Sequence, residues 1–217
     1  MKKCIILANG QAPTKKVFDH LVSIGYETLI CADGGANSAF RYNLIPDYII
    51  GDLDSLKLEI YDYYLDKCEI IQATRQNDTD VEKCLKFALQ KKFKDVILLG
   101  ATGDRLDHSF CNLGIVLKYF DKLKIRIIHQ KSLLSAYKGS VILKTIPGET
   151  ISIYGFDAKT KFFSANLKYP LKNFSLQFGT KESTSNIALG EEIHLHIKNG
   201  KAFIIRDYEL MRKNGLI

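Results

Sequence analysis

The sequence predicts an N-terminal α/β domain with a doubly wound, mostly parallel sheet, followed by a C-terminal antiparallel β-sandwich. In the first half, short apolar runs alternate with stretches whose apolar residues recur at helical spacing. From Lys124 onward, short strand-like runs follow one another with no long helix between them. The chain has 217 residues and is 46% hydrophobic, which suits one large domain or two small ones. We therefore expect domains at residues 1–122 and 123–217.

The first half has the order of elements that is typical of a parallel sheet with crossover helices. Its expected strands are residues 3–7, 28–32, 48–50, 69–72 and 95–99. Helices are expected near residues 14–24, 38–42, 58–65, 80–89 and 108–120. If these strands are parallel, their carboxyl ends meet at one edge of the sheet, which is the edge where such folds bind ligands.

The second half has strand patterns separated by turns such as Pro147-Gly148 and Asn199-Gly200. Apolar residues at 193, 195 and 197 alternate with His194 and His196, so both histidines are expected on a solvated face. Residues 179–186 have the composition of a polar loop. The expected strands are residues 125–129, 132–137, 141–143, 150–154, 161–165, 193–197 and 202–206.

The net charge of +7 raises the question of nucleic-acid binding. Through Asp121 the chain carries 15 Lys and Arg against 17 Asp and Glu, whereas the remainder carries 16 against 7. The basic residues of the second half are scattered singly along alternating strands, which is typical of a solvated sheet face. We therefore expect no nucleic-acid partner.

The sequence also indicates a cytoplasmic protein without a membrane partner. The apolar run from Cys4 to Ala8 is too short for the core of a signal peptide, and no later run could span a bilayer. The five cysteines are widely separated and form no Cys-x-x-Cys pair, so we expect reduced thiols in the core.

The most informative stretch is Gly51-Asp52-Leu53-Asp54-Ser55, which follows the third expected strand. Two carboxylates one residue apart repel each other, and a fold tolerates this most readily when a cation lies between them. The alternative is an acidic turn in which Ser55 caps the next helix.

Other expected strand ends carry acids as well. Asp33 follows the second strand, and the glycines Gly34 and Gly35 after it would let a ligand approach the backbone. Asp80 opens a helix, although Thr79 and Glu82 also have the form of a capping box that needs no ligand.

The fifth strand closes on a loop that combines glycines, Arg105 and Asp107. An arginine fork and a carboxylate at one strand end suit a metal and nucleotide site. The alternative is a surface pair between Arg105 and Asp107, which contributes little. His108, at the start of a helix, is more typical of a structural residue.

Neither a P-loop motif nor a Gly-x-Gly-x-x-Gly motif occurs in the chain. Acids that converge on one edge of the sheet still suit Mg²⁺, which takes oxygen ligands and shares them with substrate phosphates. The residues therefore predict a phosphoryl-transfer site without Walker motifs, and they leave its substrate open.

Five short motifs, in the same order, resemble the thiamine pyrophosphokinase (thiamine diphosphokinase) family over almost the whole chain. They are residues 32–37 (ADGGAN), residues 51–55 (GDLDS), Thr79-Asp80 followed by the helix that carries Cys84-Leu85, residues 100–108 (GATGDRLDH) and residues 183–186 (STSN). The resemblance implies transfer of an intact diphosphate from ATP to thiamine, with release of AMP. It also implies Mg²⁺ as cofactor and a homodimer whose active site lies at the subunit interface, with thiamine between the catalytic domain of one subunit and the sandwich of the other.

The resemblance also implies roles for individual residues. The catalytic and metal-binding acids would be Asp52, Asp54, Asp80 and Asp107. The ATP-binding residues would be Asp33, Gly34, Gly35, Thr79, Gly103, Arg105, Asp107 and His108, and the thiamine-binding residues Gln76, Ser183, Ser185 and Asn186.

One feature departs from the family, because its animal members stack thiamine on a tryptophan and this chain has none. The aromatic wall must then be Tyr or Phe, or be absent. Two alternatives to thiamine diphosphokinase activity remain. One is a pyrophosphokinase for another hydroxymethyl heterocycle such as a pterin, and the other is a basic RNA-binding protein that uses the positively charged second half of the chain.

Overall fold

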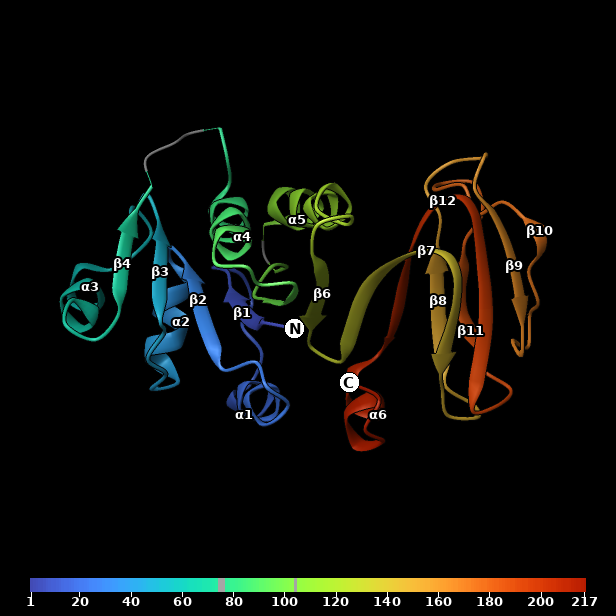
Figure 1. Cartoon of the computed structure of the whole chain (residues 1–217), viewed down its shortest axis with the longest axis horizontal. Coiled ribbons are helices and arrows are strands. Elements are labelled where there is room, and N and C mark those ends of the chain that lie inside the picture. The colour runs from blue at the N-terminus through green and yellow to red at the C-terminus, as the bar shows by residue number, and fades with distance from the viewer. Residues whose placement is uncertain (74–76, 104) are drawn as a thin grey trace. The chain divides into compact units, whose positions relative to one another are not determined.

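The structure is a computed structural model that describes residues 1–73, 77–103 and 105–217 (Figure 1). The chain divides into two compact units, Met1–Gln130 and Lys131–Ile217. Two units agree with the prediction that a part with both helices and a sheet is followed by a strand-rich part. Each unit is described by itself.

The N-terminal unit contains a parallel sheet with the strand order β6-β5-β1-β2-β3-β4. Leu7 at the end of β1 lies opposite Cys31 of β2 and Leu99 of β5, so the carboxyl ends of these strands are level. Every residue of β5 is buried, as its continuous apolar run predicts. The strands are β1 (Lys3–Leu7), β2 (Thr28–Ala32), β3 (Tyr48–Gly51), β4 (Glu69–Gln72), β5 (Asp95–Leu99) and β6 (Lys124–His129).

The helices of this unit connect the strands and cover the sheet. α4 packs on β1, β2 and β3 through buried residues that include Val81, Cys84 and Leu85. α2 packs on β1 and β2, and only a glycine fits at position 35, because a Cβ there would lie 2.0 Å from the carbonyl oxygen of Leu7. The helices are α1 (Lys15–Ser23), α2 (Gly35–Arg41), α3 (Leu58–Tyr64), α4 (Asp80–Gln90) and α5 (Leu106–Lys118).

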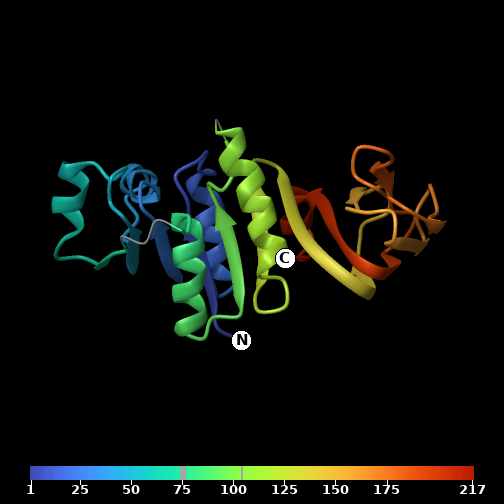
Figure 2. The ribbon, with the colours of Figure 1, turned by 90° about the horizontal axis from the view of Figure 1, so that it is seen from above.

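The C-terminal unit is built from antiparallel strands around one long strand, β12. β12 pairs with β7 along its length, and Figure 2 shows these two strands, in red and yellow, running side by side. The first half of β12 also pairs with β9 and the second half with β8, on either side of a register shift between Ile197 and Ala202. The elements are β7 (Ser132–Lys144), β8 (Thr150–Tyr154), β9 (Lys161–Ala165), β10 (Lys172–Phe174), β11 (Ser183–Ile187), β12 (Glu192–Asp207) and α6 (Tyr208–Lys213).

The core of this unit is apolar. Ile151 and Ile153 of β8 belong to one buried cluster with Ile193, Leu195 and Ile197 of β12. The predicted alternation along β12 is confirmed, because His194 and His196 are exposed on the opposite face.

Several predicted boundaries differ from the structure. The compact units divide after Gln130 rather than after residue 122, because the strand assigned to the second domain pairs in parallel with β5. The predicted strands 132–137 and 141–143 are one continuous strand, as are 193–197 and 202–206. The expected polar loop at 179–186 ends in β11, whose Ser and Asn residues give little strand signal.

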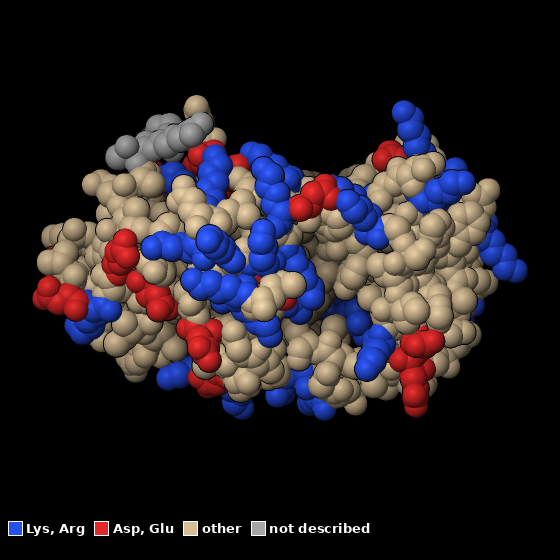
Figure 3. Space-filling view, viewed as in Figure 1, with Lys and Arg blue, Asp and Glu red and all other residues tan. Residues whose placement is uncertain are grey.

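On the face drawn in Figure 3, Lys and Arg side chains gather over the part of the N-terminal unit that holds α4 and α5. Lys118 of α5 is exposed, as are Lys91 and Lys92, which directly follow α4. The basic surface is therefore not confined to the second half of the chain, which carries the net positive charge with 16 Lys and Arg against 7 Asp and Glu. Among the helices described here, none is both long and apolar enough to cross a membrane.

Candidate active site

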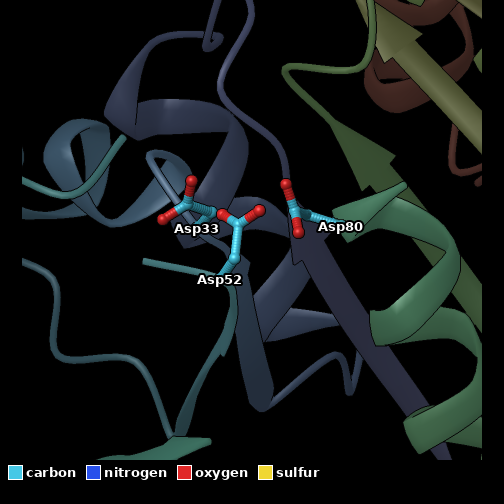
Figure 4. A group of neighbouring side chains, drawn as sticks. All are labelled: Asp33, Asp52 and Asp80. Carbon is cyan, nitrogen blue, oxygen red and sulfur yellow. The ribbon is translucent and has the colours of Figure 1, made fainter. Parts of the chain in front are cut away.

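Three acidic side chains meet at the carboxyl edge of the parallel sheet (Figure 4). Asp33 follows β2, Asp52 follows β3, and Asp80 is the first residue of α4. One carboxylate oxygen of each lies within 4.8 Å of the others, and we call these three residues the acid cluster. The expectation that acids from separate strand ends converge is met by this geometry.

Asp33 is the most constrained member of the acid cluster. Its side chain is buried, and its backbone has a φ of +42°, a conformation that non-glycine residues rarely adopt. The backbone N–H of Ser55 donates to Oδ2 at 3.1 Å, whereas Oδ1 is buried with no hydrogen-bond partner among the described residues. Burial, together with the charges of Asp80 and Asp54, raises the pKa of Asp33 to about 6, against the lowering effect of the bonds from Ser55.

The loop after β3 depends on a close approach to Asp33. A Cβ at position 51 would lie 2.6 Å from the Cβ of Asp33, so only glycine allows the two strand ends to come together. Asp52 is partly buried, whereas Asp54 is exposed and accepts a hydrogen bond from the Ser55 hydroxyl at 2.9 Å. Asp54 is therefore next to the acid cluster without being part of it.

The start of α4 only partly follows the predicted capping box. Thr79 accepts a hydrogen bond from the backbone N–H of Glu82 at 3.2 Å, as expected of an N-cap. The Glu82 side chain does not complete the box, because it accepts bonds from Lys118 and Tyr119 instead. Asp80 forms an ion pair with Lys83 at 2.8 Å.

A cavity of about 720 Å³ opens beside Asp33 and Asp80. Its lining includes four other residues predicted from the sequence, namely Thr79, Gly103, Arg105 and His108. The hydroxyl oxygen of Thr102 lines it too and, like Asp33 Oδ1, is buried without a partner in the described part of the chain. Residues that the sequence interpretation missed also line it: Asn9, Gly10, Gln11, Arg41 and Tyr42.

The sequence offers a signal for some of these missed residues. Asn9, Gly10 and Gln11 follow β1, so the rule that ligands bind at the carboxyl ends of strands applies to them as well. Arg41 and Tyr42 lie at the end of α2, where no strand end or glycine motif indicates them. Gly34 and Gly35 are buried and are not among the described lining residues, and Gly35 contributes close packing of α2 on β1.

Arg105 and Asp107 form the surface pair that the sequence left as an alternative. The Arg105 Nε and Nη2 atoms donate to the two carboxylate oxygens at 3.0 and 2.6 Å, and both side chains are exposed. The hydrogen bonds from Arg105 hold the pKa of Asp107 well below its usual range. Asp107 is not one of the three residues of the acid cluster.

The predicted thiamine-binding residues of the C-terminal unit lie on β11. A second cavity, of about 240 Å³, is lined by Ser183 and Asn186 together with Tyr169 and Phe174. Asn186 is buried, and its amide donates to the carbonyl of Tyr169 at 2.7 Å and accepts from the N–H of Tyr169 at 3.0 Å. Ser185 has a φ of +56°. Gln76, the fourth predicted residue, lies outside the described residues.

Acids gathered beside a cavity at the carboxyl edge of a parallel sheet suit a site for a metal ion and a phosphorylated ligand, as a transferase of the kinase type requires. The family model of the thiamin pyrophosphokinase catalytic domain matches residues 20–129, and the model of the thiamin pyrophosphokinase vitamin B1 binding domain matches residues 140–202. The chain therefore belongs to the thiamine pyrophosphokinase family, as the sequence motifs predicted.

Individual relatives agree with this assignment. Thiamine pyrophosphokinase 3 of Oryza sativa subsp. japonica is 30% identical over 191 residues, which cover 75% of this chain and 71% of that protein. Thiamin pyrophosphokinase 1 of Caenorhabditis elegans is 24% identical, with coverage of 81% and 77%. The crystal structure of thiamine pyrophosphokinase from Bacillus subtilis has a TM-score of 0.82 at 22% identity and covers 96% of this chain and 100% of that one, so it supports the fold.

Proposed function

We propose that this chain transfers the diphosphate of ATP to the hydroxyl group of thiamine, giving thiamine diphosphate and AMP. The observation that carries the proposal is the acid cluster of Asp33, Asp52 and Asp80 beside a cavity of about 720 Å³. The family models extend over both units of the chain, which supports thiamine as the acceptor. They give no support to a pterin or to RNA as the partner.

The acid cluster has the chemistry of a Mg²⁺ site. Its ligands are carboxylate oxygens, which Mg²⁺ prefers, and Asp33 Oδ1 is a buried acceptor without a partner in the described residues. Mg²⁺ bound there would neutralise the charge on the transferred diphosphate. We propose Asp33, Asp52 and Asp80 as its ligands, and we keep Asp54 and Asp107 as predicted acids that act beside the cluster.

The residues of the chain would act mainly by positioning and by electrostatic stabilisation. The thiamine hydroxyl attacks the β-phosphorus of ATP in line, the bond to the α-phosphate oxygen breaks, and AMP leaves. The hydroxyl proton passes to an aspartate carboxylate near the attacking oxygen. Arg105 suits the nucleotide phosphates because its guanidinium can donate two parallel hydrogen bonds.

The C-terminal unit would provide the thiamine site. We infer that its antiparallel strands form the predicted β-sandwich and that Ser183, Ser185 and Asn186 contribute to a thiamine site at the interface of a homodimer. Gln76 is proposed for the same site. In this arrangement the Asn186 side chain would hold the backbone at Tyr169 in place rather than contact the substrate, because its amide is already bonded to Tyr169. We expect the enzyme to act in the cytoplasm.

Product analysis tests the proposal. The full chain is incubated with ATP, thiamine and Mg²⁺, and AMP, ADP and thiamine diphosphate are separated by chromatography. AMP and thiamine diphosphate in equal amounts are expected. ADP would indicate a simple kinase, and a product formed only with a hydroxymethylpterin would contradict thiamine as the substrate.

A further inference from the structure

A lysine beside the acid cluster, Lys83, lies in an unfavourable place for a cation. Lys83 belongs to the first turns of α4, near the end of the helix whose dipole repels positive charge. Its side chain is only 8% exposed, although lysine is rarely buried unless it is paired. A specific interaction must therefore offset the cost of placing an ammonium group there.

That interaction is with the acid cluster. The Lys83 ammonium donates a hydrogen bond to Asp80 Oδ1 at 2.8 Å. Asp80 is one of the three members of the acid cluster, so the ammonium is held directly at the proposed metal site.

Lys86, one turn further along α4, provides the contrast. It forms an ion pair with Asp78 at 2.6 Å, but its side chain is 40% exposed and Asp78 does not belong to the acid cluster. The two lysines therefore make the same kind of contact from the same helix, and only Lys83 is directed at the proposed metal site.

We propose that Lys83 is a positioning residue that engages Asp80 before metal binds, so that tight metal binding requires the nucleotide phosphates. A carboxylate oxygen that accepts from an ammonium group is less available as a ligand, and the positive charge repels a second cation. Phosphate oxygens offer the ammonium another acceptor, which frees Asp80. This inference rests on the proposed function, because it assumes that the acid cluster holds the metal.

Mn²⁺ binding to the full chain without nucleotide tests the inference, measured by titration calorimetry. K83M should bind Mn²⁺ about tenfold more tightly than wild type, because one repelling charge is removed. K83R, which keeps the charge, and K86M, the matched control, should bind as wild type does. Addition of a non-hydrolysable ATP analogue should increase Mn²⁺ affinity more in wild type than in K83M.

Equal or weaker Mn²⁺ binding by K83M would overturn the inference, since a lysine that only supports the fold would weaken the site when removed. Thermal unfolding checks that K83M is folded, and K83Q serves as a second neutral variant if it is not. D52N distinguishes a failure of the proposed metal site from a failure of the proposed role of Lys83. If it binds Mn²⁺ as wild type does, the proposed metal site itself is wrong, whereas loss of binding in D52N with unchanged affinity in K83M contradicts only the role of Lys83.

Discussion

Acidic side chains at the two ends of the parallel sheet differ in whether their carboxylates are paired within the chain. At the amino end, Asp95 begins β5 and accepts from the Tyr26 hydroxyl at 2.8 Å and from Arg126 at 2.7 Å, with Lys124 at 3.8 Å. At the carboxyl end, three acids lie together, and Asp33 keeps one buried oxygen without a partner in the described part of the chain. Asp95 at the first end has its donors and its cations within the chain, whereas Asp33 at the second end keeps an acceptor that a bound ligand could satisfy.

This difference teaches how to separate structural from functional charges. An acidic side chain that is paired with a cation and bonded to donors within the chain stabilises the folded state, and its removal leaves the partner's charge buried and unpaired. Acids that repel one another lower stability, and a fold retains them where they bind something. Four substitutions test the contrast, from the largest expected effect to the smallest.

D95A should destabilise the protein by about 3 to 5 kcal/mol, because it leaves the largely buried Arg126 guanidinium, 13% exposed, without its carboxylate. Urea unfolding measures the loss. D66A, at an exposed acid, is the control and should change stability by less than about 0.5 kcal/mol. A loss of stability in D95A as small as that in D66A would mean that the contacts of Asp95 with Tyr26 and Arg126 contribute nothing to the stability of the fold.

D52N should lower kcat by roughly 10² or more, because it removes one charge of the preorganised acid cluster. The variant should remain folded, since Asp52 is only partly buried. Steady-state assays of AMP formation, with circular dichroism as the folding check, measure both effects. Turnover equal to that of wild type would remove Asp52 from the mechanism.

D33N should be more stable than wild type at pH 7.5, by about 1 to 2 kcal/mol. Burial raises the pKa of Asp33 to about 6 from its ordinary 3.8, so the folded protein holds this proton more tightly than the unfolded chain does. Stability from this group is therefore fully present below about pH 3.8 and is lost as the pH rises through 6. The difference between D33N and wild type should vanish near pH 4, in metal-free buffer, and a constant difference would contradict the assignment.

R105M should raise the KM for ATP about tenfold and leave the Tm unchanged, because Arg105 and Asp107 are both exposed and exposed pairs contribute little to stability. R105K separates charge from geometry, since lysine keeps the charge but cannot form the bidentate fork. An unchanged KM for ATP in both variants would mean that Arg105 and Asp107 form only a surface ion pair and take no part in ATP binding.

Much of the sheet could be predicted from the sequence, because apolar runs and helical spacing are local signals. The five N-terminal strands up to β5 and the convergence of acids at their ends follow from those signals and from parallel pairing. The family motifs also led to the correct family. The resemblance assigned Asp33 to ATP binding, and in the structure its carboxylate lies with those of Asp52 and Asp80.

The remaining features depend on contacts between distant residues. β6 has the same local pattern as the strands that follow it, and only its pairing with β5 assigns it to the N-terminal unit. Lys83 looks like an ordinary helix lysine until its burial and its bond to Asp80 are known. Arg41 and Tyr42 reach the cavity from the end of α2 through tertiary packing, which no spacing rule describes.

The pairing of β12 sets an order of events during synthesis. β12 is the common partner of β7, β8 and β9, so the C-terminal unit cannot close until the ribosome has made residues 192–207. The strand pairs described in the N-terminal unit all lie before residue 130. The nascent chain can therefore complete its first unit while the second still awaits its central strand, and for that period its apolar strands are exposed to chaperones.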